Sequence, residues 1–186
     1  MKTLYLPINS QNFNNIFASE SISPCSFYKK RGFGIPRFKT LFSEINDYLV
    51  LFNQPPEISL ENSDEVAYIL IFQLSVDESC LKQISEGIWI YPKTIYLSLK
   101  NFKKLYFLSD YEKRFVVAGA ESSKTTKGIR KYESIFEILD KKSQKKYDFN
   151  FNNKIEENKT IQHEIERDRV FNSFSSSSAS LESGTK

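Results

Sequence analysis

The sequence predicts an α+β fold, a single domain with a mixed or mainly antiparallel sheet and a few short helices. Three observations predict it. Helical spacing of apolar residues is confined to short segments, whereas short apolar runs bounded by turn residues follow one another closely. Few of these runs are separated by long crossovers, which disfavours a doubly wound parallel sheet. Strong hydrophobic clusters end near residue 140, so a charged extension follows the domain.

The N-terminal part predicts a strand at residues 4–6 and a helix at residues 11–18, with Ser10 as its N-cap. Its apolar face holds Phe13, Ile16 and Phe17. Residues 38–45 keep helical spacing, whereas residues 48–52 form a continuous apolar run that predicts a strand.

Residues 66–74 give the strongest strand pattern, and we expect this strand at the centre of the sheet. Residues 77–85 predict a short helix, because two acidic residues favour its start electrostatically. Three strands of a meander follow, at residues 88–91, 94–97 and 104–108.

The last two elements of the domain are a helix at residues 110–120 and a closing strand at residues 132–139. One side of this helix carries Tyr111, Phe115 and Ala118. The organisation expected is a globular domain at 1–140 and a charged extension at 141–173, either one helix or disordered. A Ser-rich disordered tail occupies 174–186.

Composition excludes several classes of function. The 186 residues hold 26 Lys+Arg and 23 Asp+Glu. The resulting net charge of +3 is too small for the protein as a whole to bind nucleic acid or anionic lipid by its charge. There is no apolar run of about 18 residues and no secretory leader pattern, so we expect a soluble, cytoplasmic protein without membrane contact. The bias towards Lys, Asn, Ile and Phe indicates an A+T-rich gene of bacterial or phage origin.

Catalytic and metal-binding patterns are weak. Cys25 and Cys80 form no metal-ligand spacing, and the single histidine, His163, lies in the charged extension, so neither zinc nor Cys-His catalysis is expected. We interpret the acidic cluster of Glu57, Glu61, Asp64 and Glu65 as a solvated loop, with a metal-binding or acid–base pair of carboxylates as the alternative. Residues 119–128 resemble a phosphate-binding loop only superficially, because the glycine before the lysine is missing. We expect no cofactor and no metal; the missing catalytic constellation favours a non-enzymatic protein but leaves enzyme activity undecided.

A basic and aromatic segment at residues 27–39 is the main candidate site. Basic groups neutralise phosphates while exposed rings stack on bases, which predicts single-stranded RNA or DNA binding. The other interpretation is a glycine-rich turn whose basic side chains are merely solvated. The candidate nucleic-acid-binding residues are Tyr28, Lys29, Lys30, Arg31, Phe33, Arg37 and Lys39.

Two family resemblances accompany these residues. The stretch RGFGIPRF at 31–38 resembles the octapeptide of RNA-recognition motifs, and LYLPIN at 4–9 resembles the hexapeptide beside it. The resemblance implies that Tyr5, Phe33 and Phe38 stack on bases and that Arg31 contacts phosphate. More weakly, the opening strand with residues 12–17 and 22–24 is similar to the start of bacterial toxin-type ADP-ribosyltransferases, which implies a degenerate, non-catalytic member.

The leading hypothesis is a non-enzymatic interaction domain with a protein partner, the N-terminal module of a larger bacterial or phage protein or assembly. Trp89 is expected in the core, with an exposed recognition patch beside Tyr91 as the alternative.

Overall fold

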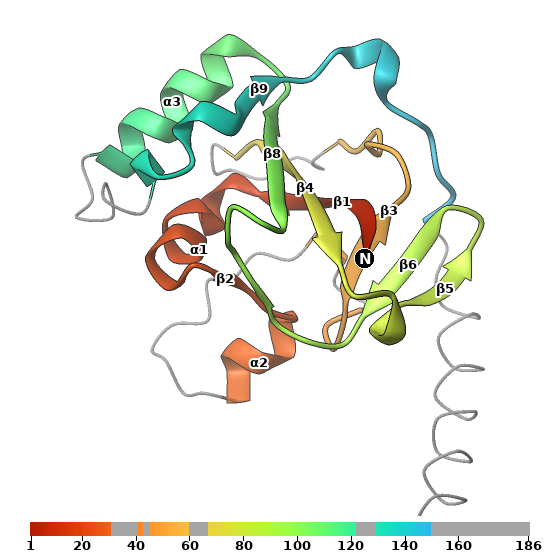
Figure 1. Ribbon diagram of the computed structural model, residues 1–186. Helices are drawn as coiled ribbons and strands as arrows, with labels where there is room; N and C mark the ends of the chain where they lie inside the picture. Colours follow the sequence, from red (N-terminus) through yellow and green to blue (C-terminus); the bar gives the residue numbers. More distant parts are fainter. Residues whose placement is uncertain (31–40, 43–44, 60–66, 122–128, 150–186) are drawn as a thin grey trace, which may run out of the picture. The chain divides into compact units, whose positions relative to one another are not determined.

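The computed structural model describes residues 1–30, 41–42, 45–59, 67–121 and 129–149 (Figure 1). The chain divides into two compact units, Met1–Asp148 and Phe149–Lys186. The helices and strands given below all belong to the first unit. The domain boundaries expected at residues 140 and 173 stay predictions.

The main element is a mixed sheet of seven strands in the spatial order β5-β6-β3-β1-β4-β8-β9. Neighbouring strands are antiparallel, except that β9 runs parallel to β8. The strands are β1 (Lys2–Asn9), β3 (Leu49–Phe52), β4 (Ile69–Val76), β5 (Lys82–Ser85), β6 (Ile88–Tyr91), β8 (Phe102–Phe107) and β9 (Phe136–Ile138). This confirms the α+β fold with a mixed sheet, and β4 lies inside it as expected.

The helices are short. They are α1 (Phe13–Ser19), α2 (Cys25–Lys30) and α3 (Asp110–Glu121), with single 3-10 turns at Ser10–Asn12, Glu78–Cys80, Glu133–Ile135 and Lys141–Ser143. Figure 1 shows α1 and α3 side by side, and the two helices are in contact. Because α3 connects the parallel strands β8 and β9, its position is determined by the sheet.

The larger core lies between α1, α3 and one face of the sheet, and Phe17 is at its centre. Its ring centroid lies 4.6 Å from Phe13, 5.7 Å from Tyr132 and 5.9 Å from Phe136. Phe13, Ile16 and Phe17 are all buried, so the predicted apolar face is confirmed. Side chains on a strand alternate between faces, and the alternate residues Leu70, Phe72 and Leu74 of β4 complete this core.

Pro7 occupies an interior strand, where a missing N–H is normally unfavourable. The Ser10 N–H donates to the Tyr68 carbonyl at 2.9 Å, so even-numbered residues of β1 direct their N–H groups to β4. Pro7 is odd-numbered, and its missing N–H therefore lies on the β3 side. There β1 pairs with β3 only at Tyr5↔Phe52, so the two strands separate next to the proline.

The prediction of a helix at residues 77–85 is wrong. The structure has only the 3-10 turn Glu78–Cys80, whose first N–H groups are capped by Asp77, and the chain then enters β5. Strand β5 pairs with β6 across a turn that holds Gly87 at φ +73°. Pairing with a neighbouring strand thus outweighed the local charge pattern.

Two further differences concern the expected meander and the helix at 38–45. The strand predicted at 94–97 becomes β7 (Ile95–Tyr96), which leaves the main sheet and pairs with β2 (Ser21–Ile22). Of residues 38–45, only 41, 42 and 45 are described, and they are not helical; the others lie outside the described residues. The closing strand begins with the 3-10 turn Glu133–Ile135 and then forms β9.

The segment after residue 140 packs back on the sheet. Lys145 forms a bridge with Pro56, and the Tyr147 ring lies 5.0 Å from Phe52. The Tyr147 hydroxyl donates to Asn53 Oδ1 at 2.6 Å. These contacts hold residues 145–147 within the first compact unit.

Candidate functional site

The predicted nucleic-acid segment is only partly described. Tyr28, Lys29 and Lys30 form the last half of α2, and their side chains lie outside the described part of the structure. Arg31, Phe33, Arg37 and Lys39 also lie outside the described residues, as does Phe38. Nucleic-acid binding by this segment therefore stays a prediction.

Tyr5, the first ring that the RNA-recognition resemblance implies, lies on β1. Its hydroxyl accepts a hydrogen bond from Gln73 Nε2 at 3.2 Å, and its ring lies 6.4 Å from that of Tyr106. The Tyr106 hydroxyl donates to Gln73 Oε1 at 3.3 Å. Among the described residues, the strands paired with β1 are β3 and β4, and neither carries residues 31–38.

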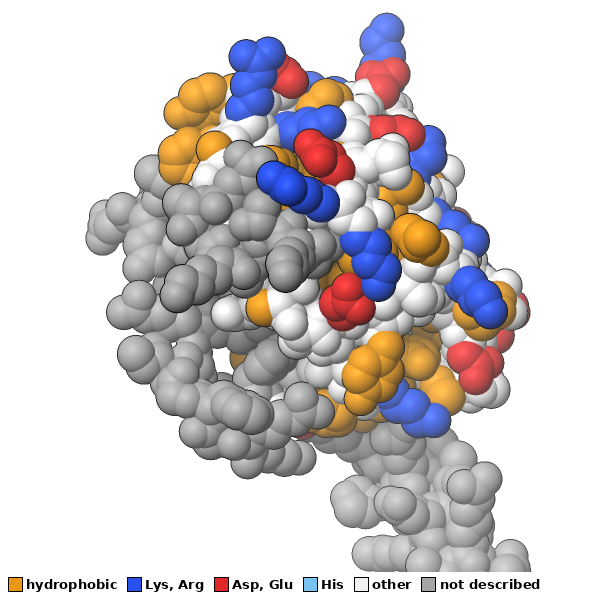
Figure 2. Space-filling view, turned by 60° about the vertical axis from the view of Figure 1, so that its left-hand side comes forward, with side chains coloured by type: hydrophobic (Ala, Val, Ile, Leu, Met, Phe, Trp, Pro, Cys, Tyr) orange, Lys and Arg blue, Asp and Glu red, His pale blue; other side chains and the backbone are white. Residues whose placement is uncertain are grey.

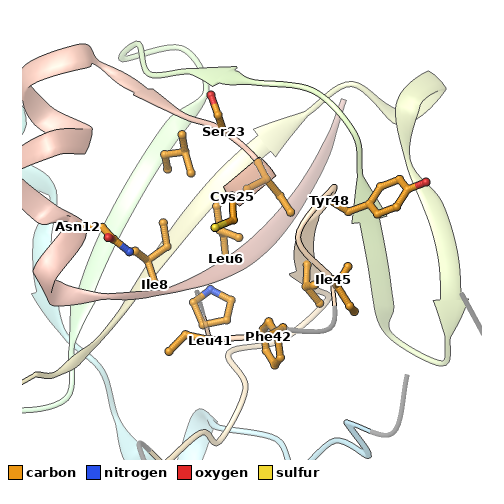
Figure 3. A pocket seen from close by; sticks show the side chains of 13 residues that line it. Leu6, Ile8, Asn12, Ser23, Cys25, Leu41, Phe42, Ile45 and Tyr48 are labelled. Atoms are coloured by element: carbon orange, nitrogen blue, oxygen red, sulfur yellow. The ribbon is translucent and has the colours of Figure 1, made fainter. Parts of the chain in front are cut away.

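A small pocket opens where β1 and β3 separate at Pro7 (Figure 3). Its cavity volume is about 40 Å³, which is room for a few water molecules and far below the ~300 Å³ of a typical ligand pocket. Figure 3 shows the Cys25 sulfur turned inward between Leu6 and Ile8, whereas the Tyr48 ring points away. Its Ser23 hydroxyl is satisfied by Thr94 at 2.8 Å. The site is an apolar packing gap.

Cys80 has a perturbed thiol pKa. Hydrogen bonds from Lys93 and Ser79 hold the pKa of the Cys80 thiol below its ordinary value, and the positive charge of Lys93 lowers it further. The thiol raises the pKa of Lys93 in return. Cys80 is partly buried, and it does not line the small pocket at Pro7. The lowered pKa favours the thiolate form of Cys80.

Charged side chains on the described surface are interspersed. Figure 2 shows blue, red and orange side chains mixed across one face, without a continuous basic stripe there. Lys104 pairs with Glu137 at 2.8 Å, and Lys131 pairs with Glu20 at 3.1 Å. Such pairing reduces the field that would attract phosphates.

Three neighbouring rings form the aromatic ridge (Tyr68, Tyr111 and Phe115): Tyr111 and Phe115 lie on the outer side of α3, and the partly buried Tyr68 packs beside them. Tyr111 is 68% exposed and Phe115 is 49% exposed. The two rings stack with centroids 6.3 Å apart. Tyr68 meets Phe115 edge to face at 5.6 Å and Tyr111 at 6.4 Å. Burial, followed by the neighbouring Tyr111, raises the pKa of Tyr68.

The opposite side of α3 anchors the helix, so the ridge has a fixed orientation. Val116 and Ala120 are buried in the core. The Lys113 ammonium donates to the Phe136 carbonyl at 2.9 Å, and the Glu112 carboxylate accepts from the Leu108 N–H at 3.1 Å. These contacts tie the inner side of the helix to β9 and to Leu108, the residue after β8.

A charged pair flanks the ridge. Arg114 Nη2 and Asp110 Oδ2 lie 2.6 Å apart, one helical turn from each other, and both side chains are mostly exposed. The ridge therefore combines aromatic area with one positive and one negative group.

The sequence pattern found the helix but missed the site. Tyr111, Phe115 and Ala118 share one side of α3 as predicted, and all three are exposed. A second apolar stripe, Val116, Val117 and Ala120, makes the inner side. The presence of two apolar stripes on one helix could have indicated the site. A surface helix needs only one apolar stripe to pack against the core, so the second stripe is left exposed.

Trp89 is half-buried against the core, which agrees with the core interpretation. The Lys2 ammonium lies 3.5 Å from its ring centroid, a cation–π contact. Tyr91 beside it is buried, so these two rings form no exposed patch.

Within the described ranges, no group of three His, Cys, Asp or Glu side chains is placed to hold a metal ion. His163 and most of the acidic cluster at 57–65 lie outside those ranges. The same ranges contain no helix with the length and apolar character needed to cross a bilayer.

Comparison with known proteins gives no match: no family model, no curated protein and no solved structure is similar to this chain.

Proposed function

We propose that this protein is a non-enzymatic interaction domain that binds a protein partner through the aromatic ridge on α3. The observation that carries the proposal is the stacked pair Tyr111 and Phe115, which are 68% and 49% exposed although they contact each other. Single exposed apolar residues are ordinary on protein surfaces, whereas a contiguous aromatic patch is typical of a binding surface.

The chemistry of the ridge fits protein recognition. Tyrosine and arginine are enriched among the residues that dominate binding energy; here Tyr68 and Tyr111 are in contact, and Arg114 lies on the same helix as Tyr111 and pairs with Asp110. The rings already rest on one another, and α3 is anchored on its inner side, so little conformational freedom remains to be lost on binding. The ridge is therefore preorganised.

The cellular setting of the domain is part of the same proposal. We place it in the cytoplasm as the N-terminal module of a larger bacterial or phage protein or assembly. Its modest net charge of +3 supports a protein partner over a polyanion.

A site-specific photocrosslinker tests this function. Benzoyl-phenylalanine is placed at Tyr111 or, as the matched control, at Tyr96, since these tyrosines are 68% and 69% exposed. In cells that make the protein naturally, irradiation is expected to give a discrete crosslinked species from position 111 and none from position 96. The same products from both positions, or no product from 111, would refute the proposal.

A further inference from the structure

We infer that the partner of the aromatic ridge is a second copy of this chain, bound through a two-fold antiparallel pairing of α3 with α3. The inference rests on the proposed function, because it names the partner of the same surface. The observation behind the inference is that the charges on this face are complementary to the charges on the same face of a second copy.

The charges of the face alternate along one flank of α3. Asp110 is negative, Arg114 is positive, and the two lie one turn apart. A two-fold axis perpendicular to the helix brings the same flank of both copies together with reversed direction. With the axis between these positions, Asp110 of each copy lies opposite Arg114 of the other. Two ion pairs then form across the interface without any like charges facing each other.

The rings complete this pairing. At about 100° per residue, Tyr111 projects between the charged flank and Phe115, in the middle of the exposed side. The same two-fold axis therefore brings Tyr111 of both copies together, and each ring removes apolar surface of the other from water. Aromatic pairs contribute about 0.5–1.5 kcal/mol beyond the area that they bury.

The position of Gly119 supplies a control. It lies on the exposed side of α3, and a Cβ added there would meet nothing within 4 Å. With the axis near residue 112, Gly119 lies beyond the N-terminal end of the partner helix. A substitution at Gly119 is therefore expected to leave the pairing unchanged.

The interface is small. A helix of 12 residues is about 18 Å long, and one such face buries less than the ~800 Å² per partner of a stable complex. We therefore expect a weak dimer, with a dissociation constant on the order of 10–100 μM.

Sedimentation equilibrium of the full chain, from about 5 to about 500 μM, tests the inference. The weight-average mass is expected to rise towards that of a dimer. Tyr111→Glu is expected to hold it at the monomer value, whereas Tyr96→Glu and Gly119→Ala follow the wild type. Circular dichroism confirms that each variant is folded.

The outcomes separate this inference from the proposed function. A wild-type chain that stays monomeric to the highest concentration overturns the second-copy partner. If position 111 then crosslinks to a different protein in cells, the proposed function stands and only the partner is wrong. A dimer that Tyr111→Glu and Tyr96→Glu weaken equally overturns the inference, because the contact would lie elsewhere.

Discussion

Tyr68, at the entrance to β4, and Phe115, in the middle of α3, meet edge to face with ring centroids 5.6 Å apart. The contact joins the residue before β4 to the outer side of the helix, although the helix is anchored by its inner side. Within the ridge, the partly buried Tyr68 therefore supports the exposed rings of Tyr111 and Phe115, which keep one arrangement before any partner binds.

The core and the ridge should respond differently to truncation. Phe17→Ala removes a buried ring that contacts Phe13, Phe72 and Tyr132, and should lower the free energy of unfolding by about 3–5 kcal/mol. Phe115→Ala, on the exposed side of α3, should cost less than about 1 kcal/mol. Urea unfolding measures both. Equal losses would place Phe115 in the core and contradict the ridge.

Glu112 should make stability depend on pH. Burial raises the pKa of its carboxyl above the ordinary 4.5, although the hydrogen bond from the Leu108 N–H opposes the rise. The folded state thus holds the proton more tightly than the unfolded chain, and the free energy of unfolding falls as pH rises from 4.5 through the raised pKa.

Glu112→Gln removes this titration but keeps an oxygen that accepts from Leu108. Relative to wild type, the variant should be more stable at about pH 7 than at about pH 4. Urea unfolding at the two pH values gives the comparison. A difference that is the same at both would show that Glu112 does not titrate as described.

Lys93 should control the reactivity of Cys80. Its ammonium holds the pKa of the thiol below the ordinary 9.0, so Lys93→Met should raise that pKa and reduce the thiolate fraction at neutral pH. Alkylation of the Cys80 peptide by iodoacetamide, followed by mass spectrometry, should slow. Lys82→Met, a lysine of β5, serves as the control and should not change the rate. Unaltered alkylation in Lys93→Met would exclude Lys93 as the cause.

We expect this protein not to bind single-stranded nucleic acid. Three of the described basic residues, Lys104, Arg114 and Lys131, each pair with a carboxylate, which reduces the positive potential around them. Fluorescence anisotropy of the full chain with labelled RNA and DNA should show no binding even at low salt. Affinity that falls with salt and is lost in the Arg31→Ala, Phe33→Ala double variant would instead establish the nucleic-acid alternative.

Local sequence predicted the strands and helices whose burial pattern is strong. The run at 48–52 and the face of Phe13, Ile16 and Phe17 follow directly from apolar spacing. Residues 77–85 failed because β5 is stabilised by β6, a neighbour that local pattern does not reveal. Pro7 fits into β1 because β3 separates from β1 at that point, and this separation depends on the tertiary structure and not on the local sequence.

The candidate site was less predictable for a related reason. Helical spacing placed Tyr111, Phe115 and Ala118 on one side of α3, but spacing alone does not say which apolar stripe faces the sheet. The crossover from β8 to β9 decides this, because it directs Val116 and Ala120 inward. Nucleic-acid binding by the segment at 27–39 stays a prediction, because residues 31–39 lie outside the described residues.

A mixing experiment tests the central claim most directly. D110R carries only positive groups at positions 110 and 114, and R114D carries only negative ones, so each variant should be monomeric by itself. An equimolar mixture at about 100 μM should show a weight-average mass clearly above that of either variant alone, because each copy then meets the opposite charge. A mixture that stays as monomeric as its components would contradict the binding of α3 to α3.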